Sequence, residues 1–283
     1  MIPFDYITEW RREAPWTMEA QVEQDLILSR AVVSLFADPE VARRLAFRGG
    51  TALYKLHLRS AVRYSEDIDL VQVTAGPIGG VLDAIRRALD PWLGLPRRTT
   101  KDGRVVLLYR MTSEAQPPVP MRLKVEINSR EHFSVFGVEA REFAVSSRWF
   151  TGSTTVTTYQ LDELLGTKLR ALYQRKKGRD LFDLFLASLL AQVDPARVVA
   201  CCERYLAHAG TRVTRAEFER NLHEKLSDET FLSDVDPLIA PDTAWSVADA
   251  VGYVQRALLP LLPGDPWRGG EHPPSRGPEG RAR

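Results

Sequence analysis

Cysteine is scarce in this chain of 283 residues, which contains only Cys201 and Cys202. Adjacent residues on a helix point in different directions, so we expect neither a disulfide between these two thiols nor a shared metal site, and we interpret both as buried and reduced. An excess of charge of either sign is also absent, because 38 Lys and Arg residues face 37 Asp and Glu residues. Any attraction to nucleic acid must therefore come from a local patch of charge.

Long hydrophobic runs are missing as well. No apolar stretch approaches the roughly 20 residues that a membrane span requires, and the first residues lack the basic start and apolar run of a signal peptide. We therefore expect a cytoplasmic protein with no membrane partner. What the chain does contain, 44% hydrophobic and 27% charged residues, is typical of a globular protein with one large core or two smaller ones.

Helical and strand patterns alternate in the first half of the chain. Apolar residues recur at helical spacing over residues 17–36, which predicts an amphipathic helix. A short apolar stretch at 45–47 predicts a strand that leads into Gly49 and Gly50, and a second helical pattern begins at Thr51. The other elements predicted in this half are strands at 68–73, 104–111, 121–128 and 143–145 and a helix at 78–89 that stops at Pro91.

The pattern changes near residue 158. Residues 152–158 are rich in Ser and Thr and are interpreted as a connector, and from 161 to about 262 the apolar spacing is helical. We predict an α+β fold, with a first domain at 1–158 built on a mixed sheet flanked by helices and an all-helical C-terminal domain at 159–267. Residues 268–283 carry Gly, Pro and charge but almost no apolar side chains, which predicts a disordered tail.

Two carboxylates share one face of the strand that begins with Asp67, Ile68 and Asp69. Residues two apart in a strand project to the same side, so Asp67 and Asp69 are paired while Ile68 points into the core. Paired carboxylates with room for water and phosphate suit magnesium. Glu126 is the best candidate for a third carboxylate if its strand lies beside the first. Taken singly, each acid is weak evidence, since such residues are commonly solvated.

A glycine turn precedes this acidic pair. Gly49 and Gly50 let backbone amides approach phosphate oxygens, and the N-terminus of the following helix adds partial positive charge. The hydroxyl of Thr51 can donate as well. Two glycines before a helix most often form only a turn, so it is the combination with the acids that predicts a nucleoside triphosphate site.

Basic residues follow in the helical half. If residues 161–185 form one continuous helix, Lys168, Arg175 and Arg179 fall along a stripe that suits a triphosphate. The alternative is an exposed helix whose basic residues are solvated, with Arg179 and Asp183 as a surface pair of little energetic weight.

Four motifs occur in a fixed order between residues 47 and 185: GG-T-AL, R-Y-S-E-D-I-D-L, L-K-V-E-I-N, and K-L-R-A-L followed by G-R-D-L-F-D-L. Together they resemble the AbiEii/AbiGii toxin family of nucleotidyltransferases, relatives of the MenT toxins within the DNA polymerase β superfamily. The resemblance implies a polymerase β-like nucleotidyltransferase core, a toxin role with a cognate antitoxin partner, and transfer of a nucleotide from an NTP, often onto a tRNA acceptor end.

The resemblance also assigns residue roles by position. Magnesium or manganese is implied as the metal and an NTP as co-substrate. The implied metal ligands are Asp67, Asp69 and Glu126. The implied catalytic residues are Asp67, Asp69, Lys168 and Asp180. The implied nucleotide-binding residues are Gly49, Gly50, Thr51, Ser65, Lys168 and Arg175. Asp183 closes the last motif and has either a catalytic or a structural role.

In the expected reaction an acceptor hydroxyl attacks the α-phosphate of the NTP, and modification of the tRNA 3′ end blocks translation. Transfer to a protein side chain, as in AMPylation, would use the same core. A metal-dependent nuclease is a second alternative, although common restriction-type nucleases place a lysine two residues after the acid, whereas Lys124 precedes Glu126. A third is a non-catalytic module that binds RNA or protein through the basic stripe. Neither the acceptor nor the base preference is determined by these motifs.

Overall fold

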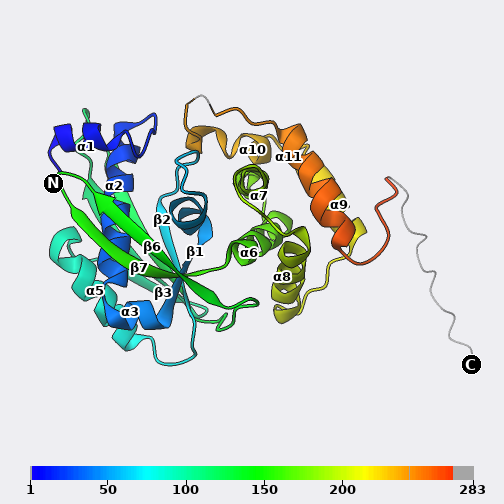
Figure 1. Ribbon diagram of the computed structural model, residues 1–283, viewed down its shortest axis with the longest axis horizontal. Coiled ribbons are helices and arrows are strands. Elements are labelled where there is room, and N and C mark those ends of the chain that lie inside the picture. Colours follow the sequence, from blue (N-terminus) through cyan, green and yellow to red (C-terminus); the bar gives the residue numbers. More distant parts are fainter. Residues whose placement is uncertain (1, 242, 270–283) are drawn as a thin grey trace, which may run out of the picture.

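A seven-stranded mixed sheet organises the first half of the chain (Figure 1). The computed structural model describes residues 2–241 and 243–269, so the predicted tail at 268–283 lies outside the described residues apart from its first two positions. The spatial order of the strands is β3-β4-β5-β2-β1-β7-β6. The strands are β1 (Leu45–Arg48), β2 (Asp67–Gln72), β3 (Arg97–Lys101), β4 (Arg104–Thr112), β5 (Pro120–Asn128), β6 (Val138–Ser146) and β7 (Thr151–Tyr159).

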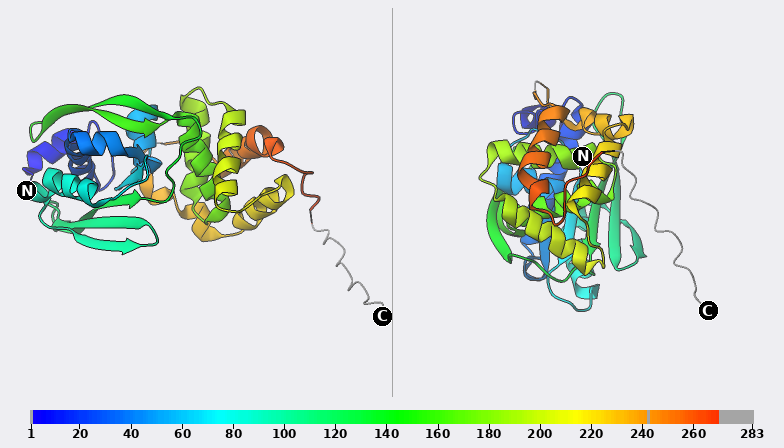
Figure 2. Two further views of the ribbon diagram at one scale, coloured as in Figure 1. Left: turned by 90° about the horizontal axis from the view of Figure 1, so that it is seen from below. Right: turned by 90° about the vertical axis from the view of Figure 1, so that its right-hand side faces the viewer.

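Helices cover one face of this sheet, which curves around them (Figure 2). Alternate strand residues such as Ile68 and Val125 are fully buried and pack in one core with Leu26 and Ile85 of the covering helices. This alternation leaves the polar residues of the same strands on the opposite face. The helices of this half are α1 (Phe4–Trp10), α2 (Glu19–Phe36), α3 (Pro39–Arg44), α4 (Gly49–Ala52), the π-helix η1 (Leu53–Leu58) and α5 (Gly79–Leu93).

The second half is helical and has its own core, which includes Leu169, Phe182 and Phe218. Leu53 and Tyr54 of η1 pack into this core as well, so the first half contributes side chains to it. The predicted α+β fold is confirmed, whereas the domain boundary near 158 stays a prediction. The elements are α6 (Leu161–Gln174), α7 (Gly178–Leu190), α8 (Pro195–His208), α9 (Arg215–Lys225), α10 (Glu229–Ser233), η2 (Asp236–Leu238), α11 (Val247–Tyr253), η3 (Val254–Leu258) and η4 (Leu259–Leu261).

Two sequence predictions about these elements are wrong, and one strand was missed. The segment at 152–158 is not a connector but most of β7, because its Thr and Val side chains suit a half-buried strand that pairs with β1 and β6. Helix α5 does not stop at Pro91, which lies inside its last turn. Strand β3 was not predicted, because its residues are exposed on both faces and show no apolar alternation.

The predicted continuous helix at 161–185 is also wrong. Helix α6 ends at Gln174 and α7 begins at Gly178, with Arg175 and Lys177 in extended conformations between them. The ammonium group of Lys225 donates hydrogen bonds to the carbonyls of Leu172 and Tyr173, which amides in the next turn would otherwise occupy. The basic stripe that depends on a continuous helix therefore does not exist.

Two expectations from the sequence concern the state of the cysteines and the absence of a membrane-spanning helix. Cys201 and Cys202 are free and buried, as predicted. Among the helices of residues 2–241 and 243–269, none combines the length and the apolar character needed to cross a membrane. The cytoplasmic location stays a prediction.

The buried carboxylate of Glu163 connects the two halves and yields a stability prediction. It accepts hydrogen bonds from the hydroxyls of Ser134 and Tyr205 and from the backbone amides of Val135 and Phe136, at 2.7 to 2.9 Å. Glu163→Ala should lower the free energy of unfolding by about 3 kcal/mol or more, because one buried and three partly buried donors lose their acceptor. Urea denaturation followed by tryptophan fluorescence measures this loss.

The matched control is Glu203→Ala, which removes an exposed carboxylate from α8. It should change the free energy of unfolding by no more than about 0.5 kcal/mol. Equal unfolding curves for the two variants would show that the Glu163 hydrogen bonds do not stabilise the fold.

Candidate active site

The predicted acids lie on neighbouring strands. Strand β2 pairs in parallel with β5, and the register places Asp69 beside Glu126 and Asp67 beside Lys124. Ile68 is fully buried on the other face, as predicted. Glu126 therefore lies on the strand next to the acidic pair, as its candidacy for a third carboxylate requires.

A lysine lies among these carboxylates. The Nζ atom of Lys124 is 2.7 Å from Asp67 Oδ2 and 3.5 Å from Glu126 Oε2. Arg104 Nε is 3.0 Å from the other oxygen of Glu126. Within the part of the chain that the structure describes, no three His, Cys, Asp or Glu side chains converge as a ready metal site. Glu126 as a third metal ligand stays a prediction, since two cations already pair with it.

Burial and mutual repulsion make the acidic pair receptive to positive charge. Burial raises the pKa of Asp69, and the neighbouring charge of Asp67 raises it further. Burial also raises the pKa of Asp67, partly offset by its hydrogen bond with Lys124. Two carboxylates that repel each other away from bulk water are stabilised by any cation that can reach them.

The glycine turn lies directly against Asp69. Helix α4 begins at Gly49 itself, two residues earlier than predicted, and Gly49 has a φ of +83°. A Cβ atom at Gly49 would overlap Oδ2 of Asp69, and one at Gly50 would overlap the guanidinium of Arg63. Both positions therefore require glycine, one for its backbone conformation and both for close approach. The turn and the acids form one compact unit.

The predicted nucleotide contact of Thr51 stays a prediction, and its hydroxyl is bonded within the protein. Its side chain is buried, its hydroxyl donates to the carbonyl of Asp67 at 2.6 Å, and it lies 2.8 Å from Oγ of Ser65. The hydroxyl thus fastens the glycine turn to the start of β2. The structure brings Thr51 and Ser65 together beside the acids, but it does not leave the Thr51 hydroxyl free to face a phosphate.

Asp183 is the centre of a fully buried ion network. Its carboxylate accepts a bidentate pair of hydrogen bonds from Arg63 at 2.7 and 3.1 Å, one from Tyr54 at 2.7 Å, and contacts Lys168 Nζ at 2.7 Å. Burial alone would raise the pKa of Asp183, but the charges and hydrogen bonds of Arg63 and Lys168 outweigh it and hold the pKa at about 2. Asp183 is therefore not part of a surface pair with Arg179.

Asp180 and Arg175 form the neighbouring part of this network. Asp180 is fully buried and accepts two hydrogen bonds from Arg175, at 2.7 and 2.9 Å, and Lys168 Nζ lies 3.5 Å away. The hydrogen bond to Asp180 raises the pKa of Arg175, and the charges of Asp69 and Asp183 add to this effect. The Arg175 side chain is 51% exposed, whereas that of Lys168 is 9% exposed. Of the two predicted triphosphate contacts, Arg175 is thus the more accessible.

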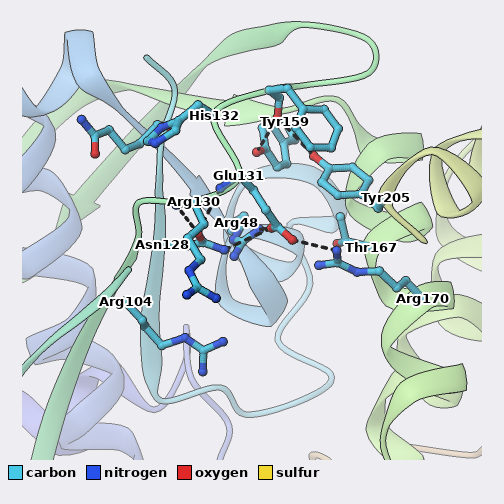
Figure 3. A network of polar contacts seen from close by, with 12 residues as sticks. Arg48, Arg104, Asn128, Arg130, Glu131, His132, Tyr159, Thr167, Arg170 and Tyr205 are labelled. Atoms are coloured by element: carbon cyan, nitrogen blue, oxygen red, sulfur yellow. Dashed lines mark hydrogen bonds and ion pairs between the residues drawn. The ribbon is translucent and has the colours of Figure 1, made fainter. Parts of the chain in front are cut away.

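Several site residues were missed from the sequence. Lys124 was detectable, since it shares the polar face of its strand with Glu126. Glu131 left no local signal: it bonds to Arg48 at 2.9 Å and to Arg170 at 2.7 Å, and Figure 3 shows it between these two arginines. This bridge connects the strand before the glycine turn to α6.

Comparison with known proteins adds family information to this geometry. The profile of the family described as nucleotidyl transferase AbiEii toxin, type IV TA system, matches residues 30–252. A search among curated proteins finds no match.

Solved structures share the fold at low sequence identity. The MenT4 nucleotidyltransferase toxin from Mycobacterium tuberculosis H37Rv is 18% identical with a TM-score of 0.61, and the match covers 92% of this chain and 90% of that one. JHP933 from Helicobacter pylori is also 18% identical, with a TM-score of 0.54 and coverage of 86% of this chain and 92% of that one. Both matches extend over nearly the whole of the other protein.

The low pKa of Asp183 gives a pH-dependent prediction. Asp183→Asn should lower the free energy of unfolding at pH 7 by about 3–5 kcal/mol, because Arg63 and Lys168 lose their buried counter-charge. The ordinary pKa of 3.8 falls to about 2 on folding, so this stabilisation is present above pH 4 and is lost as the pH falls toward 2. The difference between the wild-type protein and the variant should therefore shrink from pH 5 to pH 2, by roughly 1.4 kcal/mol for each unit of pKa shift.

Chemical denaturation at several pH values measures this difference. Asp236→Asn, at an exposed position, is the control and should track the wild-type protein throughout. A constant difference between Asp183→Asn and wild type over this pH range would contradict the assignment.

Proposed function

The chain belongs to the AbiEii nucleotidyl transferase toxin family of type IV toxin–antitoxin systems, and on this premise we propose that it transfers a nucleoside monophosphate from an NTP to the 3′ end of tRNA and so blocks translation. The observation that carries the proposal is the contact of the glycine turn at Gly49 with Asp69, one of two carboxylates on a single strand face. A phosphate loop and a metal-binding pair placed this close can act on one triphosphate.

Two sequence-based alternatives no longer stand. Membership of a nucleotidyltransferase family excludes a nuclease and a non-catalytic module as the principal function. The non-catalytic hypothesis also relied on the stripe from Lys168 to Arg179, and the break after Gln174 removes that stripe. Transfer to a protein side chain remains the alternative to tRNA, because it needs the same catalytic groups.

A divalent metal ion, magnesium or manganese, fits the donor set in this proposal. Magnesium is commonly held by one or two carboxylates together with substrate phosphates, which Asp67 and Asp69 can provide without a third acid. Glu126, beside Asp69, is proposed as an additional ligand. When bound, the metal supplies charge neutralisation and polarises phosphate oxygens. Lys124, 2.7 Å from Asp67, already places a positive charge beside this carboxylate, which supports the proposal of a cation site.

The chain's own residues would orient the triphosphate. Backbone amides at Gly49 and Gly50 can approach phosphate oxygens, since neither glycine carries a side chain of its own. Arg175 is hydrogen-bonded to Asp180, and the charge of Asp69 favours its positively charged form. Its guanidinium can therefore neutralise the charge of the leaving pyrophosphate. Lys168 stays a predicted triphosphate contact, although its ammonium is bonded to Asp183.

The proposal includes a protein partner. A toxin of this family implies a cognate antitoxin.

The acceptor can be identified directly. We expect that incubation with each α-labelled NTP, total tRNA and total lysate protein will label tRNA with a preferred nucleotide, and that EDTA will abolish the labelling. Separation of the RNA and protein fractions on gels measures the distribution of label. Label in the protein fraction alone would replace tRNA with a protein acceptor.

Replacement of one metal-binding carboxylate tests the site itself. Asp69→Asn should reduce label transfer by roughly 10³-fold or more, the scale of losing a group that stabilises charge in the transition state. The variant should stay folded, because burial and the charge of Asp67 make the ionised Asp69 unfavourable in the native state.

Glu66→Gln is the matched control, since it removes an exposed carboxylate next to Asp67. It should retain transfer within about twofold, as expected for a surface substitution. Wild-type activity in a folded Asp69→Asn variant would refute the assignment of the site.

A further inference from the structure

Basic side chains are concentrated on the open face of strands β3 to β5. Cross-strand partners share a face of a sheet, and the register groups Arg97 with Leu108, Lys101 with Arg104, and Arg110 with Arg122. Lys124 and Glu126 of β5 lie on this same face, while α2 and α5 pack on the other. The exposed members of this basic platform are Arg97, Lys101, Arg104, Arg110 and Arg122.

Two like-charge pairs face each other directly on the platform. Lys101 is the cross-strand partner of Arg104, and Arg110 is the partner of Arg122. Like charges directly opposite each other destabilise a sheet. Within residues 2–241 and 243–269, the ion pairs of the structure include Arg104 with Glu126 but none for the other three residues. A sheet that tolerates this repulsion is suited to a polyanion that relieves it.

The platform is contiguous with the candidate active site. Arg122 precedes Lys124 by two residues on the same strand face, and Lys124 contacts Asp67. At the other end, a cavity of about 630 Å³ is lined by three basic residues, Lys101, Arg104 and Arg130, by the acids Asp102 and Glu131, and by residues at the end of α8. Figure 3 shows the side chains of Arg104 and Arg130 pointing into the same space. The basic surface thus extends along β5 and the β3–β4 hairpin.

The dimensions and composition of the platform favour RNA as its occupant. Arg97 and Lys101 are four residues apart, which is about 13 Å in a strand, and the platform spans three strands about 4.8 Å apart. A single triphosphate at Asp67 cannot reach all of it. The face has no aromatic residue, and its apolar members, such as Val106 and Leu108, are half-buried, so it lacks the apolar centre typical of a protein interface.

We infer that the open face of β3, β4 and β5 binds the phosphate backbone of the acceptor RNA and directs its 3′ end toward Asp67 and Asp69. This inference rests on the proposed function, because it names the surface that the acceptor uses. The contacts are to phosphates and sugars, since the platform offers charge but no groups arranged to read bases. Binding is therefore independent of sequence and strongly dependent on salt.

A triple variant tests the platform. Arg97→Ala, Arg110→Ala and Arg122→Ala together should weaken binding of total tRNA roughly 10-fold or more and reduce the slope of log affinity against log salt concentration by about 2 to 3. The KM for tRNA should rise in parallel, while the KM for the NTP and the turnover number stay within about twofold of wild type. Fluorescence anisotropy and labelling kinetics provide these values.

The control carries the same change in net charge at other sites. Arg98→Ala, Arg204→Ala and Arg220→Ala remove exposed arginines, one from the opposite face of β3 and two from α8 and α9. This variant should bind tRNA as the wild-type protein does. The thermal midpoint of the platform variant should be unchanged or raised, because the repulsion between Arg110 and Arg122 is removed.

The outcomes separate this inference from the proposed function. Equal tRNA affinity for the two triple variants would overturn the platform even if tRNA is the labelled acceptor. A platform variant that loses affinity for poly-glutamate but not for tRNA would indicate a protein occupant and also overturn it. If the wild-type protein labels only protein, the proposed tRNA acceptor is refuted. If the platform substitutions then also leave tRNA anisotropy unchanged, the RNA-binding platform is refuted as well.

Discussion

The candidate site depends on the buried ion pairs and hydrogen bonds of the Asp183 carboxylate. Its partners come from three other elements: Arg63 from the segment before β2, Lys168 from α6 and Tyr54 from η1. A charge removed from water is tolerated only when its partners are in place. The glycine turn, the acidic strand and the helical half must therefore assemble together, because the same network that neutralises Asp183 also positions Arg63 against Gly50.

Other acids repeat this arrangement around the site. Glu131 joins Arg48 at the end of β1 to Arg170 of α6, and Glu163 joins the segment before β6 to Tyr205 of α8. Each carboxylate receives donors from distant parts of the chain. Arginine and lysine partners outweigh burial at Asp183 and Glu131 and lower the pKa of each, whereas the pKa values of Asp67 and Asp69 are raised.

Errors in the sequence predictions have specific physical causes. Strand β7 was interpreted as a connector because Thr and Ser are common in loops, yet its β-branched residues pair with β1 and β6 in the sheet. The helix at 161–185 was predicted to be continuous because its local residues favour helix, but α6 ends at Gln174, where Lys225 from about 50 residues later in the chain bonds to the carbonyls of Leu172 and Tyr173. In both cases partners distant in the sequence contact the segment whose structure differs from the prediction.

The amino-acid sequence is sufficient to predict the α+β fold, the strands that carry the acids, and the shared face of Asp67 with Asp69 and of Lys124 with Glu126. These features follow from the period of the backbone, which is visible where apolar and polar residues alternate. Three further features depend on tertiary packing: Asp69 lies beside Glu126, Thr51 fastens the turn to β2, and Asp183 pairs with a residue 120 positions away. Register and ion pairing depend on how separate elements pack, and no local pattern encodes that choice.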